Sequence, residues 1–207
     1  MGSLTCLTDP TAVLVIDASA VINLNASGYA KEIFTALPNR IAVTNIVPKE
    51  LETGRGRGRK DAAQLDELVA AGLVEIVQLD EKAEWYFEQL VVGPAATTLD
   101  DGEAGTIAYA VSKEATAVID ERKATRICGE RFPTLRVGCT ADIFAHEQVQ
   151  HSLGATLLAD ALFSALYRGR MRVLPRHIDW VVGLIGRNRA ALCVSLPNTV
   201  RLALPKD

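Results

Sequence analysis

Two short apolar runs in the sequence each stop at an aspartate. Residues 12–16 are followed by Asp17, and residues 116–119 are followed by Asp120. Runs of this length and β-branched character predict strands buried on both faces of a parallel sheet. The carboxyl ends of such strands meet at one edge, where ligands bind. Asp17 and Asp120 are therefore expected to point into one crevice.

Two further acids, Glu50 and Glu103, fall near predicted helix starts that face the same edge. Each of the four acids has a structural alternative, as a helix cap or a first-turn acid. Together, however, four converging carboxylates repel one another by several kcal/mol unless a cation neutralises them. A ligand set made only of oxygen suits Mg²⁺ or Mn²⁺ rather than zinc. Such an ion activates water and stabilises charge on phosphate, which predicts nuclease or phosphatase chemistry.

A small-molecule phosphatase is the less favoured of these two chemistries. Phosphatases that work through an aspartyl phosphate carry a second Asp two positions after the first, as the general acid. Here that position is Ser19. The pattern thus favours attack of water on a phosphodiester.

The segments that must position these acids alternate between strand and helix patterns. Strands are predicted at residues 12–16, 41–44, 73–79, 116–119 and 135–137. Helices are predicted at residues 20–36 with a break at Gly28, at 50–54, 61–71, 81–92, 102–113 and 122–131. This alternation predicts an α/β domain around a mainly parallel sheet. After residue 140 helix patterns dominate, at residues 155–167 and 177–185.

Length and composition limit the class of protein. The chain has 207 residues, of which 49% are hydrophobic and 23% charged, which excludes a disordered chain and indicates one domain with an appendage. No apolar stretch reaches the roughly 18–20 residues that span a bilayer, and the start carries no export signal. The four cysteines and three histidines form no zinc pattern. We therefore expect a cytoplasmic protein with reduced thiols and no membrane partner.

The charge is divided unevenly along the chain. Residues 1–150 contain 14 basic and 22 acidic residues, whereas residues 151–207 contain 8 basic and 3 acidic ones. The basic tail is consistent with a solubility distribution, a longer nucleic-acid surface or a partner-binding segment. Its apolar stripes at helical spacing favour helices that cap the domain.

A short Arg-Gly segment follows Glu50 directly. Its glycines disfavour a stable helix, so we expect a loop. The loop has two interpretations: a clamp for RNA phosphates beside the acidic crevice, or a solvated connection. Adjacency to the crevice favours RNA, and Arg122 after Asp120 is a weaker candidate. The predicted RNA-binding residues are Arg55, Arg57, Arg59, Lys60 and Arg122.

Four segments together resemble the acidic motifs of PIN-domain proteins. They are VLVIDASAVINL at residues 13–24, NIVPKELETG at 45–54, LDDGEAGTIAYA at 99–110 and AVIDERKA at 117–124. The resemblance implies a PIN-like three-layer α/β/α domain over residues 11–145, followed by a helical C-terminal extension over residues 146–207. It also implies a Mg²⁺- or Mn²⁺-dependent endoribonuclease that cuts single-stranded RNA. The catalytic and metal-binding residues would be Asp17, Glu50, Glu103 and Asp120.

The chain departs from the usual pattern in ways that leave alternatives open. The spare candidates for metal ligation are Asp101, Glu121 and Asp142. Many PIN-domain proteins are VapC-type toxins, which implies an antitoxin partner, but typical toxins lack such a long extension. Exposed apolar helices indicate a homodimer. The alternative to a nuclease is a non-catalytic PIN-like module that binds RNA or protein.

Overall fold

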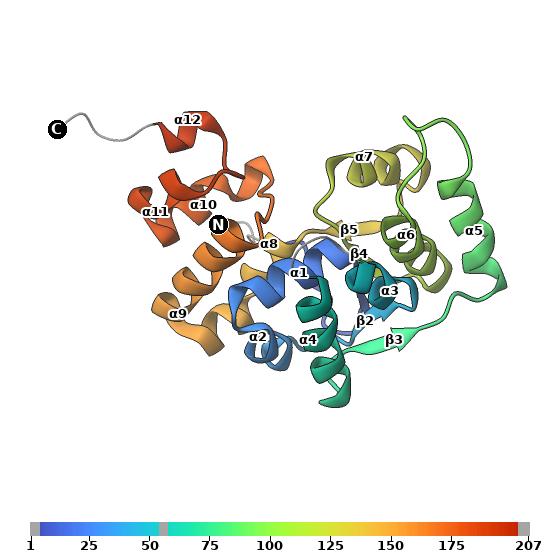
Figure 1. Cartoon of the computed structure of the whole chain (residues 1–207), viewed down its shortest axis with the longest axis horizontal. Helices are drawn as coiled ribbons and strands as arrows, with labels where there is room; N and C mark the ends of the chain where they lie inside the picture. Colours follow the sequence, from blue (N-terminus) through green and yellow to red (C-terminus); the bar gives the residue numbers. More distant parts are fainter. Residues whose placement is uncertain (1–4, 54–57, 203–207) are drawn as a thin grey trace.

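The computed structural model describes residues 5–53 and 58–202, and for residues 58 and 59 it describes the backbone alone. Its centre is a five-stranded sheet with the order β3-β2-β1-β4-β5, in which every neighbouring pair is parallel (Figure 1). The strands are β1 Leu14–Ile16, β2 Ile41–Thr44, β3 Glu75–Val77, β4 Thr116–Val118 and β5 Arg136–Gly138. The predicted parallel α/β architecture is confirmed.

Helices connect the strands and then continue beyond the sheet. The first seven are α1 Ala18–Ser27, α2 Ala30–Ala36, α3 Ile46–Thr53, α4 Gly58–Ala70, α5 Glu81–Val91, α6 Asp101–Lys113 and α7 Arg122–Arg131. The later ones are α8 Thr140–Phe144, α9 Glu147–Arg168, α10 Pro175–Ile185, α11 Arg187–Leu192 and α12 Asn198–Arg201.

The sheet carries a separate apolar core on each face, which makes the domain three layers. Successive side chains of a strand point to opposite faces. Leu14 and Ile16 of β1 accordingly join a core with residues from α1 to α4 and from α8 to α10. Val15 joins the other core, with residues of α5, α6 and α7. A strand buried on both faces accounts for the unbroken apolar run before Asp17.

The strand order places a topological switch point beside β1. The chain passes from β1 outward through β2 and β3, and then returns to place β4 on the other side of β1. Connections therefore leave β1 and β4 in opposite directions, which opens a crevice at their carboxyl ends. In register, Ile16 of β1 pairs with Val118 of β4. The residues that follow these two strands thus lie beside the same crevice.

The structure changes two predicted helices and one predicted loop. The predicted helix over residues 20–36 is divided at Gly28, which takes a left-handed φ of 81° and caps α1. The α9 helix is kinked at Gly154, where φ is 67°. The loop prediction for the Arg-Gly segment is wrong for residues 58–60, because α4 begins at Gly58. Glycine is tolerated at a helix start, where it does not interrupt an existing hydrogen-bonded turn.

The C-terminal extension shares a core with the sheet domain. Leu162 and Leu166 of α9 and Val181 of α10 belong to the same buried cluster as Leu14 and Ile16. In Figure 1, α9 lies beside α1 and α2, while α10, α11 and α12 stack outside it. No helix within the described ranges is both long and apolar enough to cross a membrane.

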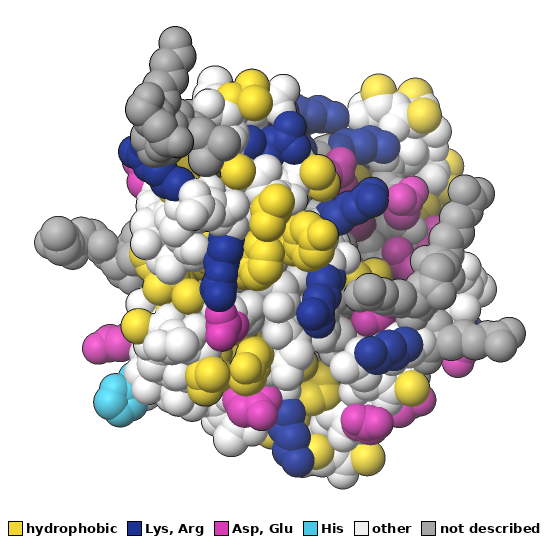
Figure 2. Space-filling view, turned by 60° about the vertical axis from the view of Figure 1, so that its left-hand side comes forward, with side chains coloured by type: hydrophobic (Ala, Val, Ile, Leu, Met, Phe, Trp, Pro, Cys, Tyr) yellow, Lys and Arg dark blue, Asp and Glu magenta, His cyan; other side chains and the backbone are white. Residues whose placement is uncertain are grey.

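The face shown in Figure 2 mixes apolar and basic side chains. The basic groups, in dark blue, are spread among yellow apolar groups and do not form one continuous patch. Several arginines of the extension are also engaged in ion pairs, including Arg172, Arg176 and Arg189. The basic character of the tail therefore does not by itself define a nucleic-acid surface.

Candidate metal centre

Asp17 stands between β1 and α1 and caps the helix. Its Oδ1 accepts hydrogen bonds from the backbone N of Ala20 at 2.7 Å and from the Ser19 hydroxyl at 2.9 Å. The Ser19 hydroxyl lies 2.8 Å from Oδ2 as well. Only 2% of the Asp17 residue is exposed. Its structural role as a cap is thus present, and it fixes the carboxylate at the edge of the sheet.

Asp120 lies just after β4 and is held by three donors from two other elements. Its Oδ1 accepts a hydrogen bond of 2.8 Å from the backbone N of Thr140, at the start of α8. Its Oδ2 accepts from the Thr140 hydroxyl at 2.7 Å and from Asn23 Nδ2, on α1, at 2.6 Å. The residue is 6% exposed. Asp120 is therefore rigidly oriented beside Asp17.

These two buried carboxylates repel each other. Burial and then the neighbouring charge of Asp120 raise the pKa of Asp17 to about 8, despite the hydrogen bonds that it accepts. Burial likewise raises the pKa of Asp120 above its ordinary value. No lysine or arginine forms an ion pair with either group within the part of the chain that the structure describes. Such a pair binds a proton or a cation to relieve the repulsion.

Glu50 and Glu103, on α3 and α6, are the other two predicted acids. The side chain of Glu50, on α3, is so close to Gly102 that a Cβ there would overlap its Oε2. Burial and the charges of Asp100, Glu121 and Glu50 raise the pKa of Glu103 to about 7. The charge of Glu103 in turn raises the pKa of Asp17. The four predicted acids are therefore electrostatically coupled, and the glycine before Glu103 leaves room for Glu50.

The chemistry of the four predicted acids suits a hard divalent cation, but the structure does not bring three of their oxygens together: among the described residues, the group of three potential ligand atoms within 4.8 Å of one another is Cys139, Asp142 and His177. The four acids offer carboxylate oxygens from α3, α6 and the ends of β1 and β4, with two of them buried and unpaired by any described basic residue. Oxygen ligands of this kind suit Mg²⁺ or Mn²⁺.

Comparison with known proteins identifies the family. The sequence profile described as PIN domain matches residues 13–178. The chain belongs to the PIN-domain family. One similar solved structure is described as the crystal structure of VapBC2 from Rickettsia felis bound to a DNA fragment from their promoter. It is 18% identical, covers 61% of this chain and 98% of that chain, and superposes with a TM-score of 0.42. No curated protein gives a significant match.

In this PIN domain, the spare acids differ in their surroundings. Asp101 is exposed in the first turn of α6, where its charge contributes to the raised pKa of Glu50. Glu121 caps α7 by accepting hydrogen bonds from the backbone N of Arg122 and Lys123, and it pairs with Arg172 at 3.3 Å. Its carboxylate is thus engaged by groups other than a metal ion.

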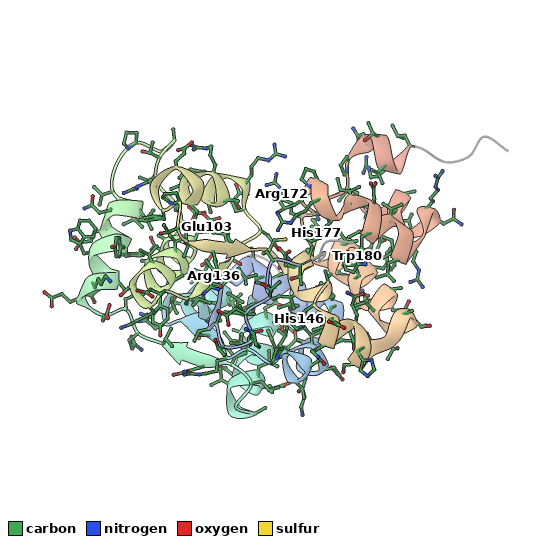
Figure 3. The ribbon with its side chains drawn as sticks, turned by 180° about the vertical axis from the view of Figure 1, so that it is seen from behind. Glu103, Arg136, His146, Arg172, His177 and Trp180 are labelled. Carbon is green, nitrogen blue, oxygen red and sulfur yellow. The ribbon has the colours of Figure 1, made fainter. Side chains whose placement is uncertain are left out.

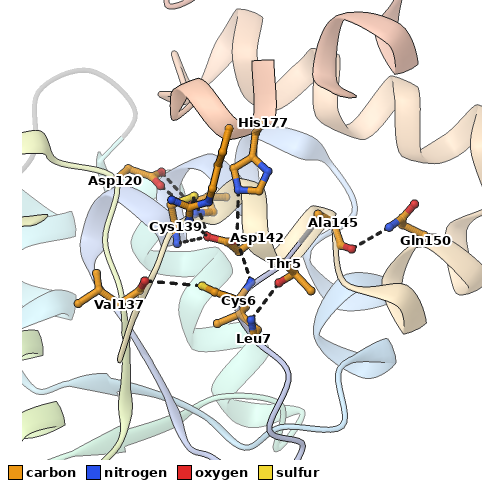
Figure 4. A network of polar contacts seen from close by, with 12 residues as sticks. Thr5, Cys6, Leu7, Asp120, Val137, Cys139, Asp142, Ala145, Gln150 and His177 are labelled. Carbon is orange, nitrogen blue, oxygen red and sulfur yellow. Dashed lines mark hydrogen bonds and ion pairs between the residues drawn. The ribbon is translucent and has the colours of Figure 1, made fainter. Parts of the chain in front are cut away.

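The third spare acid, Asp142, belongs to a separate polar network (Figure 4). Together with Cys139 and His177 it places potential metal-ligand atoms within 4.8 Å of one another. Asp142 Oδ2 accepts from the backbone N of Cys139 at 2.9 Å, from Cys139 Sγ at 3.0 Å and from Arg176 Nη2 at 2.6 Å. Its Oδ1 lies 3.2 Å from the backbone N of Cys6 and 3.1 Å from His177 Nε2. These donors and the guanidinium already satisfy the carboxylate, so we interpret the trio as a hydrogen-bonded anchor.

The predicted RNA-binding residues are only partly within the described chain. Arg55 and Arg57 lie outside the described residues, as does the side chain of Arg59. Lys60 is exposed on α4, and Arg122 is exposed in the first turn of α7, two residues after Asp120. Figure 3 shows Arg172 on the side of the extension that faces α7, consistent with its ion pair with Glu121.

The sequence interpretation missed the residues that hold Asp120. The sequence analysis assigns no role to Asn23, which lies within a predicted helix, or to Thr140, which lies near the end of the predicted PIN-like domain. The available signal for Asn23 was a polar residue six positions after Asp17 in an otherwise apolar helix. For Thr140 the chain offers no local signal, because its contact with Asp120 joins residues 20 positions apart.

Proposed function

We propose that this PIN-domain protein is a metal-dependent endoribonuclease. The observation that carries the proposal is the pair of buried carboxylates, Asp17 and Asp120, at the carboxyl ends of adjacent central strands. Their mutual repulsion is relieved by a proton or a cation and by no described basic side chain. Glu50 and Glu103 complete the proposed ligand set for one or two Mg²⁺ or Mn²⁺ ions.

The residues divide the work in this proposal. A bound ion supplies an activated water and stabilises charge on the phosphate. Asp17 and Asp120 are fixed by hydrogen bonds from α1 and α8, so their oxygens are preorganised to bind an ion. Glu103, whose pKa is raised to about 7 by burial and by neighbouring acids, would hold the ion through its carboxylate, because a cation relieves the same repulsion. Arg122, which is exposed two residues after Asp120, would contact a phosphate in this proposal. RNA as the substrate rests on the family resemblance.

The decisive experiment measures cleavage of a labelled single-stranded RNA by the purified chain. We expect cleavage with Mn²⁺, its loss with EDTA, and its loss in Asp17→Asn and Asp120→Asn. Asp160→Asn is the control, since Asp160 lies on α9, outside the proposed site, and pairs with Arg189. Wild-type rates in Asp17→Asn and Asp120→Asn would refute the site assignment.

The non-catalytic alternative is tested by the same samples. It predicts RNA binding that weakens with salt, and no cleavage under any divalent ion. The buried pair favours the nuclease, because a pure binding module gains nothing from two carboxylates that repel each other.

The role of toxin is a further proposal that rests on the family. It includes an antitoxin partner, a homodimer and a cytoplasmic location. A small neighbouring reading frame whose product suppresses the RNA cleavage would support it. A neighbourhood without such a frame, together with a monomer by light scattering, would contradict it.

A further inference from the structure

Residues 169–177 of the C-terminal extension contact both of the structures that hold Asp120. The first is Asn23, which donates to Asp120 Oδ2, and the second is the start of α8, where Thr140 donates to both oxygens. The two contacts are made by different residues of the extension and on different sides of the carboxylate.

The first contact is a close approach of backbone to Asn23. A Cβ at Gly169 would lie 2.8 Å from Asn23 Oδ1 and 2.7 Å from the carbonyl oxygen of Ala165. Both distances are shorter than real Cβ contacts, so a side chain at this position would displace its neighbours. Asn23 is 4% exposed and has little room to move. Gly169 thus leaves the amide of Asn23 free to face Asp120.

The second contact passes through Asp142. Asp142 accepts from the backbone N of Cys139, the residue that caps α8, and so fixes the start of that helix. From α10, Arg176 Nη2 lies 2.6 Å from Asp142 Oδ2. His177 Nε2, on the same helix, lies 3.1 Å from Asp142 Oδ1 (Figure 4). Both side chains of the anchor pair Asp142–His177 are completely buried. Thr140 follows Cys139 directly, so the extension determines where its two donors point.

We propose that Gly169, Arg176 and His177 are positioning residues for the Asp120 carboxylate, so that the extension forms part of the support of the metal centre. The role of these residues in holding Asp120 rests on the geometry alone. Their effect on metal binding rests on the proposed function. Residues that support a ligand in this way typically change metal affinity by about 10–100-fold when replaced.

The test compares Arg176→Met with Arg189→Met by Mn²⁺ calorimetry. Arg189 is a good control because it also pairs with an acid, at 2.7 Å, with a side chain 43% exposed against 48% for Arg176. We expect the Kd for Mn²⁺ to rise about tenfold in Arg176→Met and to stay within about twofold in Arg189→Met. Arg176→Lys should recover part of the affinity. Loss of a positive charge by itself would tighten cation binding, so a positional effect and a simple charge effect have opposite signs.

A second pair of variants tests the other contact. Gly169→Ala should weaken Mn²⁺ binding about tenfold, because the added Cβ displaces Asn23. Gly183→Ala is the control, since nothing lies within 4 Å of a Cβ at that position on α10. Thermal unfolding of all five variants would separate a local effect from a loss of folded protein.

Amide hydrogen exchange at Thr140 provides a readout that needs no metal. Its N–H donates to Asp120 Oδ1, so exchange should become faster in Arg176→Met and remain unchanged in both controls. An unchanged Kd and unchanged Thr140 exchange in Arg176→Met and Gly169→Ala would overturn the inference. Faster exchange in a protein whose wild type binds no Mn²⁺ would instead refute the proposed function and leave the positioning role supported.

Discussion

Two buried carboxyl groups in this protein, Asp17 and Asp142, have pKa values that are shifted in opposite directions. Both are nearly or fully inaccessible, at 2% and 0% exposure, and both accept a hydrogen bond from a backbone N–H group at the start of a helix. Yet the pKa of Asp17 is raised to about 8, whereas the pKa of Asp142 lies below its ordinary value. Burial and a hydrogen bond at a helix start are common to both residues, so they do not explain the difference between the two pKa values.

The difference comes from what surrounds each carboxylate. Burial alone would raise the pKa of Asp142, but hydrogen bonds from His177 and Cys139 and the charge of Arg176 outweigh it. Asp17 has local donors and faces the negative charge of Asp120. The carboxylate of Asp142 is satisfied by its own donors, whereas Asp17 and Asp120 keep a repulsion that a proton or a cation would relieve. The comparison supports an anchoring role for the first region and the proposed metal site for the second.

The largest expected effect is on activity, in Asp17→Asn. We expect RNA cleavage to fall by more than about 100-fold, since a direct ligand should matter more than a supporting residue. Asparagine also caps helices well, and it removes the repulsion with Asp120. The metal-free variant should therefore unfold at the same temperature as wild type or higher. A large loss of thermal stability in Asp17→Asn would contradict the distinction between Asp17 and Asp142, because it would show that Asp17 also anchors the fold.

The converse is expected for Asp142→Asn. Removal of its charge leaves Arg176 and the helix start without their acceptor, so we expect a loss of about 2–3 kcal/mol in the free energy of unfolding. Urea denaturation measures this loss. Asp160→Asn is the control and should cost no more than about 1 kcal/mol, since its ion pair with Arg189 is partly solvated. Equal losses in the two variants would contradict the anchoring role.

The stability of the protein should depend on pH in two ways, one caused by the acids near Asp17 and the other by Asp142. A carboxyl whose pKa is raised by folding binds protons more tightly in the native state, so its contribution is lost as the pH rises through the folded value. Asp17 at about 8 and Glu103 at about 7 should thus lower the stability of the metal-free protein between about pH 5 and 8. Asp142 acts oppositely, because its contribution is lost as the pH falls below about 4.

Thermal unfolding at a series of pH values, with and without Mn²⁺, measures how the free energy of unfolding changes with pH. We expect the free energy of unfolding to fall by more than about 1 kcal/mol from pH 5 to 8 without metal. Mn²⁺ should remove most of that fall, and Asp17→Asn should reduce it. A flat profile in the metal-free wild type would show that the strand-end acids are not coupled as described.

The smallest effect is expected for Glu121→Ala. This residue caps α7 and is half-exposed, so we expect a loss of about 1 kcal/mol in the free energy of unfolding. The Kd for Mn²⁺ should stay within about threefold of wild type. A loss of Mn²⁺ binding as large as in Asp17→Asn would instead make Glu121 a direct ligand and enlarge the metal centre.

Sequence reasoning reached the strand ends and the family because those signals are local. The apolar runs before Asp17 and Asp120, the break at Gly28 and the helix start at Glu103 all depend on neighbouring residues. It failed at the start of α4, where the glycines were weighed as helix breakers without regard to their position in the first turn. It also failed at Asn23 and Thr140, whose partner is distant in the chain.

The sequence by itself determined the chemical character of this protein: an α/β chain of the PIN type with an aspartate at the end of each of two buried strands. Only the tertiary structure decided which buried acids have their charge compensated by neighbouring groups and which do not. Asp17 and Asp142 are the same residue type, and each lies at the start of a helix, Asp17 before α1 and Asp142 in the first turn of α8. Their charges are governed by groups that the fold brings from other elements, namely Asp120 for the first and Arg176 and His177 for the second. Electrostatic interactions act over distance in space, so the sequence positions of these groups could not reveal them.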